Sequence, residues 1–160
     1  MITKLRFLAV IALLPATLTF AQAAKQQTKM THATGTFDVK ITPAPADDKN
    51  AAIGRMSIAK QWHGDMQGTS QGEMLTAQTD VKGSGVYVAL EQFTGTVGGR
   101  KGSFLMHHTG IMTRGEPHLA ISIVPDSGSG ELRGITGTLD IVITEGKHSY
   151  DLTYTIADGP

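Results

Sequence analysis

The sequence predicts an all-β protein, an antiparallel barrel of about eight strands, and two observations support this. Apolar and polar residues alternate through successive segments of the 160-residue chain, which places apolar side chains on one face of each strand. Short glycine-rich segments separate these strands, and no segment has the period of an amphipathic helix. About eight strands close into a barrel that side chains fill or that holds one small ligand. A two-sheet β-sandwich is the alternative, and the long strands and glycine corners favour the barrel.

The first 23 residues are predicted to be a cleaved signal peptide rather than part of the fold. Lys4 and Arg6 form a positively charged start, and Phe7–Phe20 is an apolar run interrupted by Pro15. This run is too short for a comfortable membrane span, and small residues precede a cleavage site after Ala23. The sequence therefore predicts export to the periplasm or the extracellular medium, with no membrane association after cleavage.

The rest of the chain is predicted to be a short mobile leader over residues 24–30 and a single barrel domain over residues 31–160. Alternation predicts a strand in each of the following segments: Thr31–Ile41, Ile53–Met66, Thr69–Thr79, Ser84–Thr96, Ser103–Met112, His118–Val124, Thr138–Thr144 and Tyr150–Ile156. A proline- and aspartate-rich segment, residues 42–50, is expected to be an exposed loop. Turns are expected at these positions: Gly68, Gly83, Gly98–Gly102, Arg114–Pro117 and Glu145–Lys147.

The stretch Asp126–Gly137 stands out for its glycines. Residues Asp126–Gly130 favour a tight turn, because they tolerate positive φ or hydrogen-bond their own backbone. Gly134 and Gly137 mark positions where a closing sheet must bend or where two backbones approach closely. We expect this stretch to form a corner of the barrel.

Composition argues against a domain held by disulfides and against a nucleic-acid-binding protein. The chain contains no cysteine, so the domain must be held together by its core rather than by disulfides. Removal of Lys4 and Arg6 leaves 12 basic and 14 acidic side chains, a net charge of −2. This balance gives no electrostatic footprint for nucleic acid.

Local motifs give weak signals for catalysis or metal binding. Ser70 lies in a Gly-Thr-Ser-Gln-Gly segment that matches a nucleophile elbow, but no helix follows, as that motif requires. The glycine-rich segment Gly95–Ser103 fails the spacing of a phosphate-binding loop. His107 and His108 point to opposite faces of a strand, and His63 and Asp65 share a face expected to lie outside. We therefore expect no metal site and no cofactor.

Four polar side chains occupy strand positions with an apolar residue two positions away, so the alternation predicts that they point into the barrel. Polar groups there predict a water-filled pocket or buried charge pairs. The polar members are Lys60, Glu73, Glu91 and His108. The expected apolar walls of such a pocket are Trp62, Tyr87, Phe93 and Tyr150. Two alternatives stay open: a register slip that turns one or two of these groups outward, or a structural pair between Lys60 and Glu73. The phase of Val86–Phe93 is ambiguous, because both faces carry apolar side chains.

Several segments in register resemble the bacterial domain-of-unknown-function family 3224. They are Gly54–Lys60, His63–Met74, Pro125–Gly137 and Gly146–Tyr150, and the resemblance spans nearly all of Met30–Ile156. It implies an antiparallel barrel similar to that of allene oxide cyclase and of the plant dirigent proteins. It implies no activity and no catalytic residues.

Two classes of function follow from the sequence. The first is an exported barrel that binds a small, partly apolar molecule in its mouth. The second, by analogy of fold with allene oxide cyclase, is an isomerase or cyclase that acts on a small apolar substrate. Glu73 or Glu91 would then be the acid or base, with His108 as proton carrier. A homo-oligomer is compatible with either.

Overall fold

The computed structural model describes residues 29–45 and 52–157, which fold into eight strands and one short 3₁₀ helix. The predicted signal peptide, most of the predicted leader and most of the predicted loop 42–50 lie outside the described residues. The elements are β1 (Thr31–Pro43), β2 (Ile53–Gly64), β3 (Met66–Gln78), β4 (Gly85–Val97), β5 (Arg100–Thr113), β6 (Glu116–Ile123), η1 (Gly130–Leu132), β7 (Ile135–Thr144) and β8 (Lys147–Ile156).

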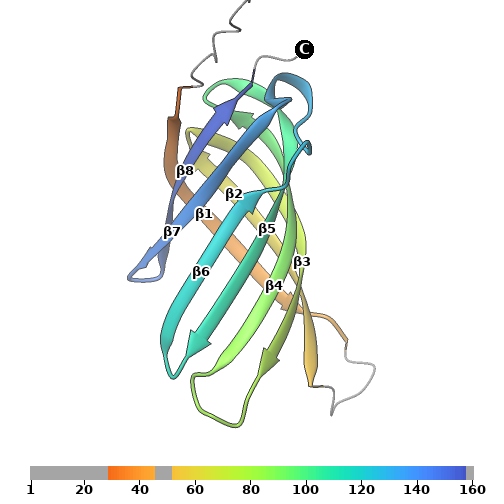
Figure 1. The fold of residues 1–160 in the computed structure, drawn as a ribbon, viewed down its shortest axis with the longest axis vertical. Helices are drawn as coiled ribbons and strands as arrows, with labels where there is room; N and C mark the ends of the chain where they lie inside the picture. The colour runs from red at the N-terminus through yellow and green to blue at the C-terminus, as the bar shows by residue number, and fades with distance from the viewer. Residues whose placement is uncertain (1–28, 46–51, 158–160) are drawn as a thin grey trace, which may run out of the picture.

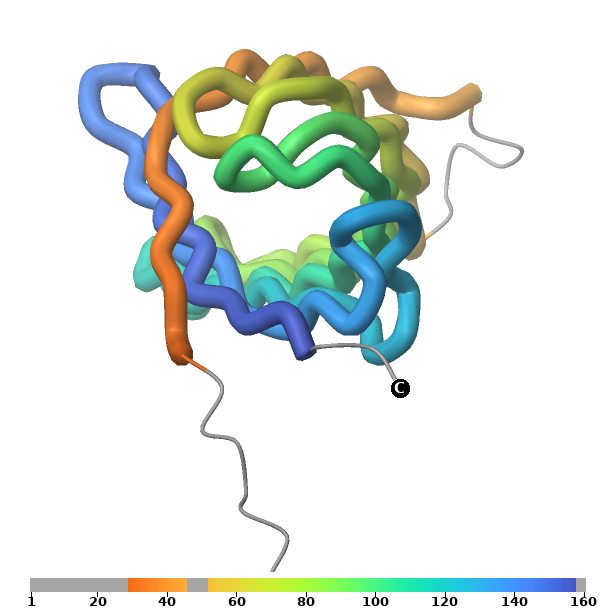
Figure 2. The backbone as a smooth tube through the Cα atoms, turned by 90° about the horizontal axis from the view of Figure 1, so that it is seen from above, coloured from red at the N-terminus to blue at the C-terminus, as the bar shows by residue number. Residues whose placement is uncertain are grey.

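Each strand pairs antiparallel with its neighbour in the sequence, and β1 pairs with β8 to close the barrel. Figure 1 shows the tilted strands from the side, and Figure 2 shows the backbone closing into a ring. The all-β barrel predicted from the alternation is confirmed, and the sandwich alternative is wrong. Among the described residues, no helix is long and apolar enough to span a bilayer.

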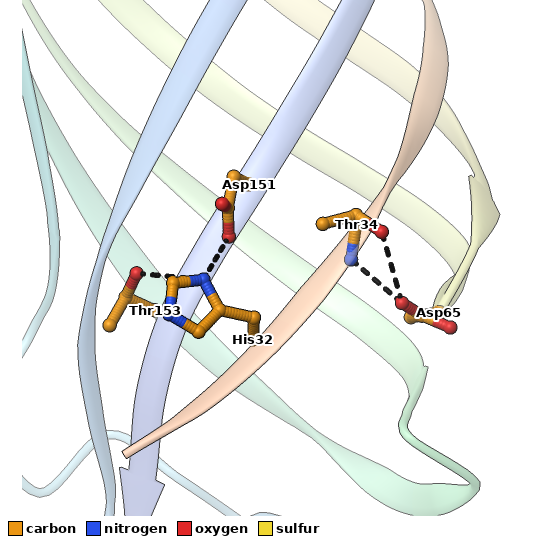
Figure 3. Close-up of polar contacts among 5 residues, drawn as sticks. All are labelled: His32, Thr34, Asp65, Asp151 and Thr153. Atoms are coloured by element: carbon orange, nitrogen blue, oxygen red, sulfur yellow. Dashed lines mark hydrogen bonds and ion pairs between the residues drawn. The ribbon is translucent and has the colours of Figure 1, made fainter.

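Polar side chains on the outer surface reinforce the closure of the ring. His32 on β1 lies 2.8 Å from a carboxylate oxygen of Asp151 on β8, and Asp65 accepts a 2.8 Å hydrogen bond from the backbone N–H of Thr34 (Figure 3). Inside the barrel, the Tyr150 hydroxyl accepts a hydrogen bond from the N–H of Met66 and donates one to the carbonyl of His63. These contacts fix the β2–β3 turn against the β1–β8 seam.

The β2–β3 turn lies at Gly64 and Asp65, so the prediction of a turn at Gly68 is wrong. Gly68 lies within β3 and pairs with Gly95 of β4. A side chain at Gly68 would collide with the backbone of Thr94 and Gly95, so glycine is needed there for close approach of two strands rather than for a turn.

The two ends of the barrel differ. At the end where β1 begins and β8 ends, a continuous apolar core fills the interior, with Trp62, Phe93, Phe104 and Leu152 almost fully buried. Leu132 of η1 is also fully buried, so the stretch Asp126–Gly137 packs an apolar side chain into this core. Phe37, Trp62, Phe104, Tyr150 and Leu152 are buried in this core, and Ile141 is partly buried against them.

The structure also shows which residues of β4 point into the barrel. Tyr87, Ala89, Glu91 and Phe93 point inward, whereas Val86, Val88 and Leu90 lie on the outer surface. The exposed apolar residues explain why the alternation could not decide between the two faces.

Candidate functional site

A cavity of about 640 Å³ occupies the other end of the barrel, where β3 is connected to β4 and β5 to β6. Its walls are mainly aliphatic and include Val39, Ile58, Met74 and Ile141, with Tyr87 packed on Gly110. The connections β3–β4 and β5–β6 and the β7–β8 hairpin surround its mouth. The position thus matches the barrel mouth expected from the sequence.

One side of the cavity is formed by two strands that separate. Within the described chain β6 and β7 pair in register only at Ser122 and Thr138, near the closed end. Beyond this pair the two strands diverge (Figure 1), and Leu119 of β6 and Ile141 of β7 both line the cavity. The cavity wall is therefore not sealed by backbone hydrogen bonds between β6 and β7.

The floor of the cavity is polar. Moving along β2 from the open end, Ile58 and Lys60 line the cavity, whereas the next inward residue, Trp62, belongs to the closed core. On β5, His108 lines the cavity and Met106 below it is fully buried. Lys60 and His108 therefore lie at the same depth, at the boundary between cavity and core.

A buried ion pair lies beneath this floor. Lys60 Nζ donates a 2.8 Å hydrogen bond to Glu91 Oε2, and the Glu91 side chain has no exposed surface. The Lys60 ammonium also lies 4.8 Å from the centre of the Phe37 ring and 5.1 Å from that of Trp62. Aromatic faces stabilise a desolvated cation, so both the carboxylate and the rings hold this charge.

Glu91 connects all the buried polar side chains of the described residues, which are Lys60, Ser70, Glu91 and His108. The Ser70 hydroxyl donates a short hydrogen bond to Glu91 Oε1 and accepts a 2.7 Å bond from the indole N–H of Trp62. We call these four residues the buried polar network. Through Ser70 the network is hydrogen-bonded to the Trp62 indole in the closed core, and two of its members, Lys60 and His108, line the cavity.

The network holds Glu91 in its ionised form. Burial raises the pKa of Glu91, but His108, Lys60 and Ser70 lower it more strongly, and the result is a pKa of about 2. Burial also raises the pKa of Tyr87, and the Glu91 carboxylate adds to this effect. At neutral pH Glu91 is thus a fixed negative charge and not a proton donor.

His108 is the least satisfied member of the network. Its Nε2 atom lies 3.2 Å from Glu91 Oε2 but makes no hydrogen bond. Nε2 is thus a buried polar atom that faces the Glu91 carboxylate without a hydrogen-bonding partner, which is uncommon in a protein interior.

The sequence-predicted residues fall into three places. Lys60, Tyr87 and His108 line the cavity, whereas Trp62, Phe93 and Tyr150 belong to the core beneath it. Glu91 is buried below the floor and reaches the cavity only through Lys60 and His108.

The inward placement of Glu73 is wrong. Its side chain is 62% exposed on the outer surface, where it pairs with Arg55 at 3.4 Å. The inward residues of β3 include Ser70 and Met74 rather than Glu73. Lys60 pairs with Glu91, so the predicted pair between Lys60 and Glu73 is also wrong.

Two contributors were missed. His148 lines the cavity and stacks on Phe37 with ring centres 5.0 Å apart, and Ser70 belongs to the buried polar network. The sequence carried a signal for His148, because this residue is in phase with Tyr150 on β8. It carried no clear signal for Ser70, because the local pattern of β3 does not show which face points inward.

Histidines on the outer surface make pairs rather than clusters. His63 lies 3.2 Å from Asp38, and Asp65 contacts Thr34 instead of His63. In the described ranges, no three His, Cys, Asp or Glu side chains come together in a way that could hold a metal ion.

The fold and site define a small antiparallel barrel, closed at one end, with an apolar cavity above a charged floor. A family model described as "Protein of unknown function (DUF3224)" matches residues 33–154, and the chain belongs to this family. The crystal structure of a DUF3224 protein of unknown function from Shewanella oneidensis MR-1 is similar, with 46% identity and a TM-score of 0.77. That similarity covers 82% of this chain and 100% of the other. No match is found among curated proteins.

Proposed function

We propose that this protein binds a small, partly apolar molecule in the cavity at the open end of the barrel. The observation that carries the proposal is the cavity of about 640 Å³ with aliphatic walls and a polar floor. Small-molecule sites are commonly about 300–1,000 Å³, mostly apolar, and contain a few placed polar groups. Here those groups are Lys60 and His108, and they would orient one polar end of the ligand.

The enzyme alternative has less support. Of the two carboxylates expected as acid or base, Glu73 is on the outer surface and Glu91 is buried beneath the floor and ionised. A general acid or base must come within hydrogen-bonding reach of the substrate. Lys60 and His108 remain as groups that could touch a substrate, and both also suit a binding site.

The binding proposal is tested with the neutral, apolar dye Nile red and a matched pair of variants on β3. Met74→Trp places a large side chain in the cavity, whereas Leu75→Trp changes the adjacent residue, which is exposed on the outer surface. The dye should bind the wild type and Leu75→Trp with equal affinity and Met74→Trp at least about tenfold more weakly. Equal binding by folded Met74→Trp, or no binding by the wild type, would count against the cavity.

The natural ligand is sought by native mass spectrometry of the protein purified from its own cells. A bound mass that survives purification and is absent from Met74→Trp identifies a cavity ligand. The same bound mass on both proteins would place it elsewhere.

We also propose that the chain is exported, because residues 1–23 have the charge, apolar run and small-residue site of a signal peptide. Export would make the cavity available to ligands outside the cytoplasm.

A further inference from the structure

Resting on the proposed function, we propose that the ligand is an organic monocarboxylate whose carboxylate lies against Lys60 and His108 while its apolar body fills the cavity. Three features of the cavity support this choice: the balance of charge around it, the free donors at its floor, and the charge of the buried polar network.

The charge balance favours an anion. Among the described residues that line the cavity, two are lysines, Lys60 and Lys82, and one is acidic, Asp80. Three histidines also line it: His108 and His148 at the floor and His118 near the mouth. The buried Glu91 carboxylate neutralises Lys60 but does not line the cavity, so it presents no negative surface to a ligand.

The floor offers hydrogen-bond donors. An ammonium group carries three protons, and Lys60 uses one of them on Glu91 Oε2. His108 has two ring nitrogens, and protonation makes both of them donors. An imidazolium at this position would face Glu91 with Nε2 and have its other nitrogen available to a ligand oxygen. Two adjacent donors suit the two oxygens of a carboxylate.

The charge of the network favours one negative charge over two. With His108 protonated, Lys60 and His108 carry two positive charges against the single negative charge of Glu91. A monocarboxylate brings the floor to neutrality, and buried charges are tolerated when they are paired in this way. A dianion such as a phosphate monoester would leave an unpaired negative charge.

The test compares decanoate with decanol, which has the same chain and no charge, as competitors of bound Nile red. Decanoate should bind wild type at least about tenfold more tightly than decanol. His108→Phe should lose this preference while still binding decanol. His107→Phe changes the neighbouring outward residue of β5 and should behave as wild type.

His108→Phe removes an unpartnered buried polar atom but also a group that stabilises the Glu91 carboxylate, so its folding is measured first by urea unfolding. If it does not fold, His108→Gln replaces it, because glutamine is polar but cannot be charged. Equal affinities of wild type for decanol and decanoate would overturn this inference and leave the binding function intact. A preference for decanoate that persists in a folded His108 variant would also overturn it. Failure of Nile red to bind wild type would overturn the binding function itself.

Discussion

The buried pair between Lys60 and Glu91 allows a quantitative test of the structure. The two groups are 2.8 Å apart, with side-chain exposures of 6% and 0%. Lys60→Met removes the ammonium but leaves the Glu91 carboxylate in an apolar interior. Removal of one partner of a buried pair costs about 3–5 kcal/mol, because it leaves an uncompensated charge.

The pKa of Glu91 gives a second value for the free energy at stake in this pair. Its fall from 4.5 to about 2 corresponds to about 3 kcal/mol by which the surroundings favour the ionised form over the neutral form. Lys60 supplies only part of this effect, since His108 and Ser70 contribute as well. We therefore expect Lys60→Met to lower the free energy of unfolding by about 3 kcal/mol, the lower end of the range above.

A double-mutant cycle in urea measures the pair. Lys60→Met with Glu91→Gln should recover much of the loss, because neither partner then leaves a lone charge. The exposed pair of Arg55 and Glu73 is the control, and its coupling should be below about 1 kcal/mol. Additive effects at Lys60 and Glu91 would refute the pairing, as would equal coupling in the two pairs.

Three further predictions concern the core, acid stability and export. Leu152→Ala should cost about 2–5 kcal/mol in urea unfolding, because Leu152 has no exposed surface, and a loss below about 1 kcal/mol would mean that the phase of β8 is wrong. Because the pKa of Glu91 is lowered in the folded state, its ionised form stabilises the fold above about pH 4.5, and this stabilisation is lost as the pH falls toward about 2. The melting temperature of wild type should fall over this range, and that of the double variant Lys60→Met with Glu91→Gln should lack this decrease. The same pH dependence of the melting temperature in both proteins would exclude Glu91 as its source. N-terminal sequencing of the mature protein should start at Ala24, and a mature chain that keeps Phe7–Phe20 would contradict cleavage.

The number and order of strands could be predicted because most strands carry an alternation of apolar and polar residues and are bounded by turn residues. The predicted strand Thr31–Ile41 corresponds to β1 and Ser84–Thr96 to β4, with bounds shifted by one or two residues. Such alternation reflects the geometry of a strand with one face in a core, which depends on local sequence.

The phase of β3 could not be predicted, and this caused the error at Glu73. The inward face of β3 carries Ser70 and Gly72 rather than a row of apolar residues, whereas the outward Leu75 suggested the opposite phase. Gly72 is small because Glu91 and its backbone lie against it, so that a side chain there would collide with β4. The inward face is thus set by the neighbouring strand, which the local pattern of β3 does not reveal.

The position of the buried polar network suggests a reason for the two charged residues, Lys60 and Glu91, in the interior of the barrel. An apolar replacement of a buried ion pair is often neutral or stabilising, so stability alone does not explain the retention of Lys60 and Glu91. The closed half of the barrel already has a continuous core, and the network lies only where that core meets the cavity. Glu91 touches no cavity surface, but it holds Lys60 and faces His108, both of which do. We therefore propose that the buried carboxylate positions Lys60 and His108, so that the polar floor can contact the polar end of a bound ligand.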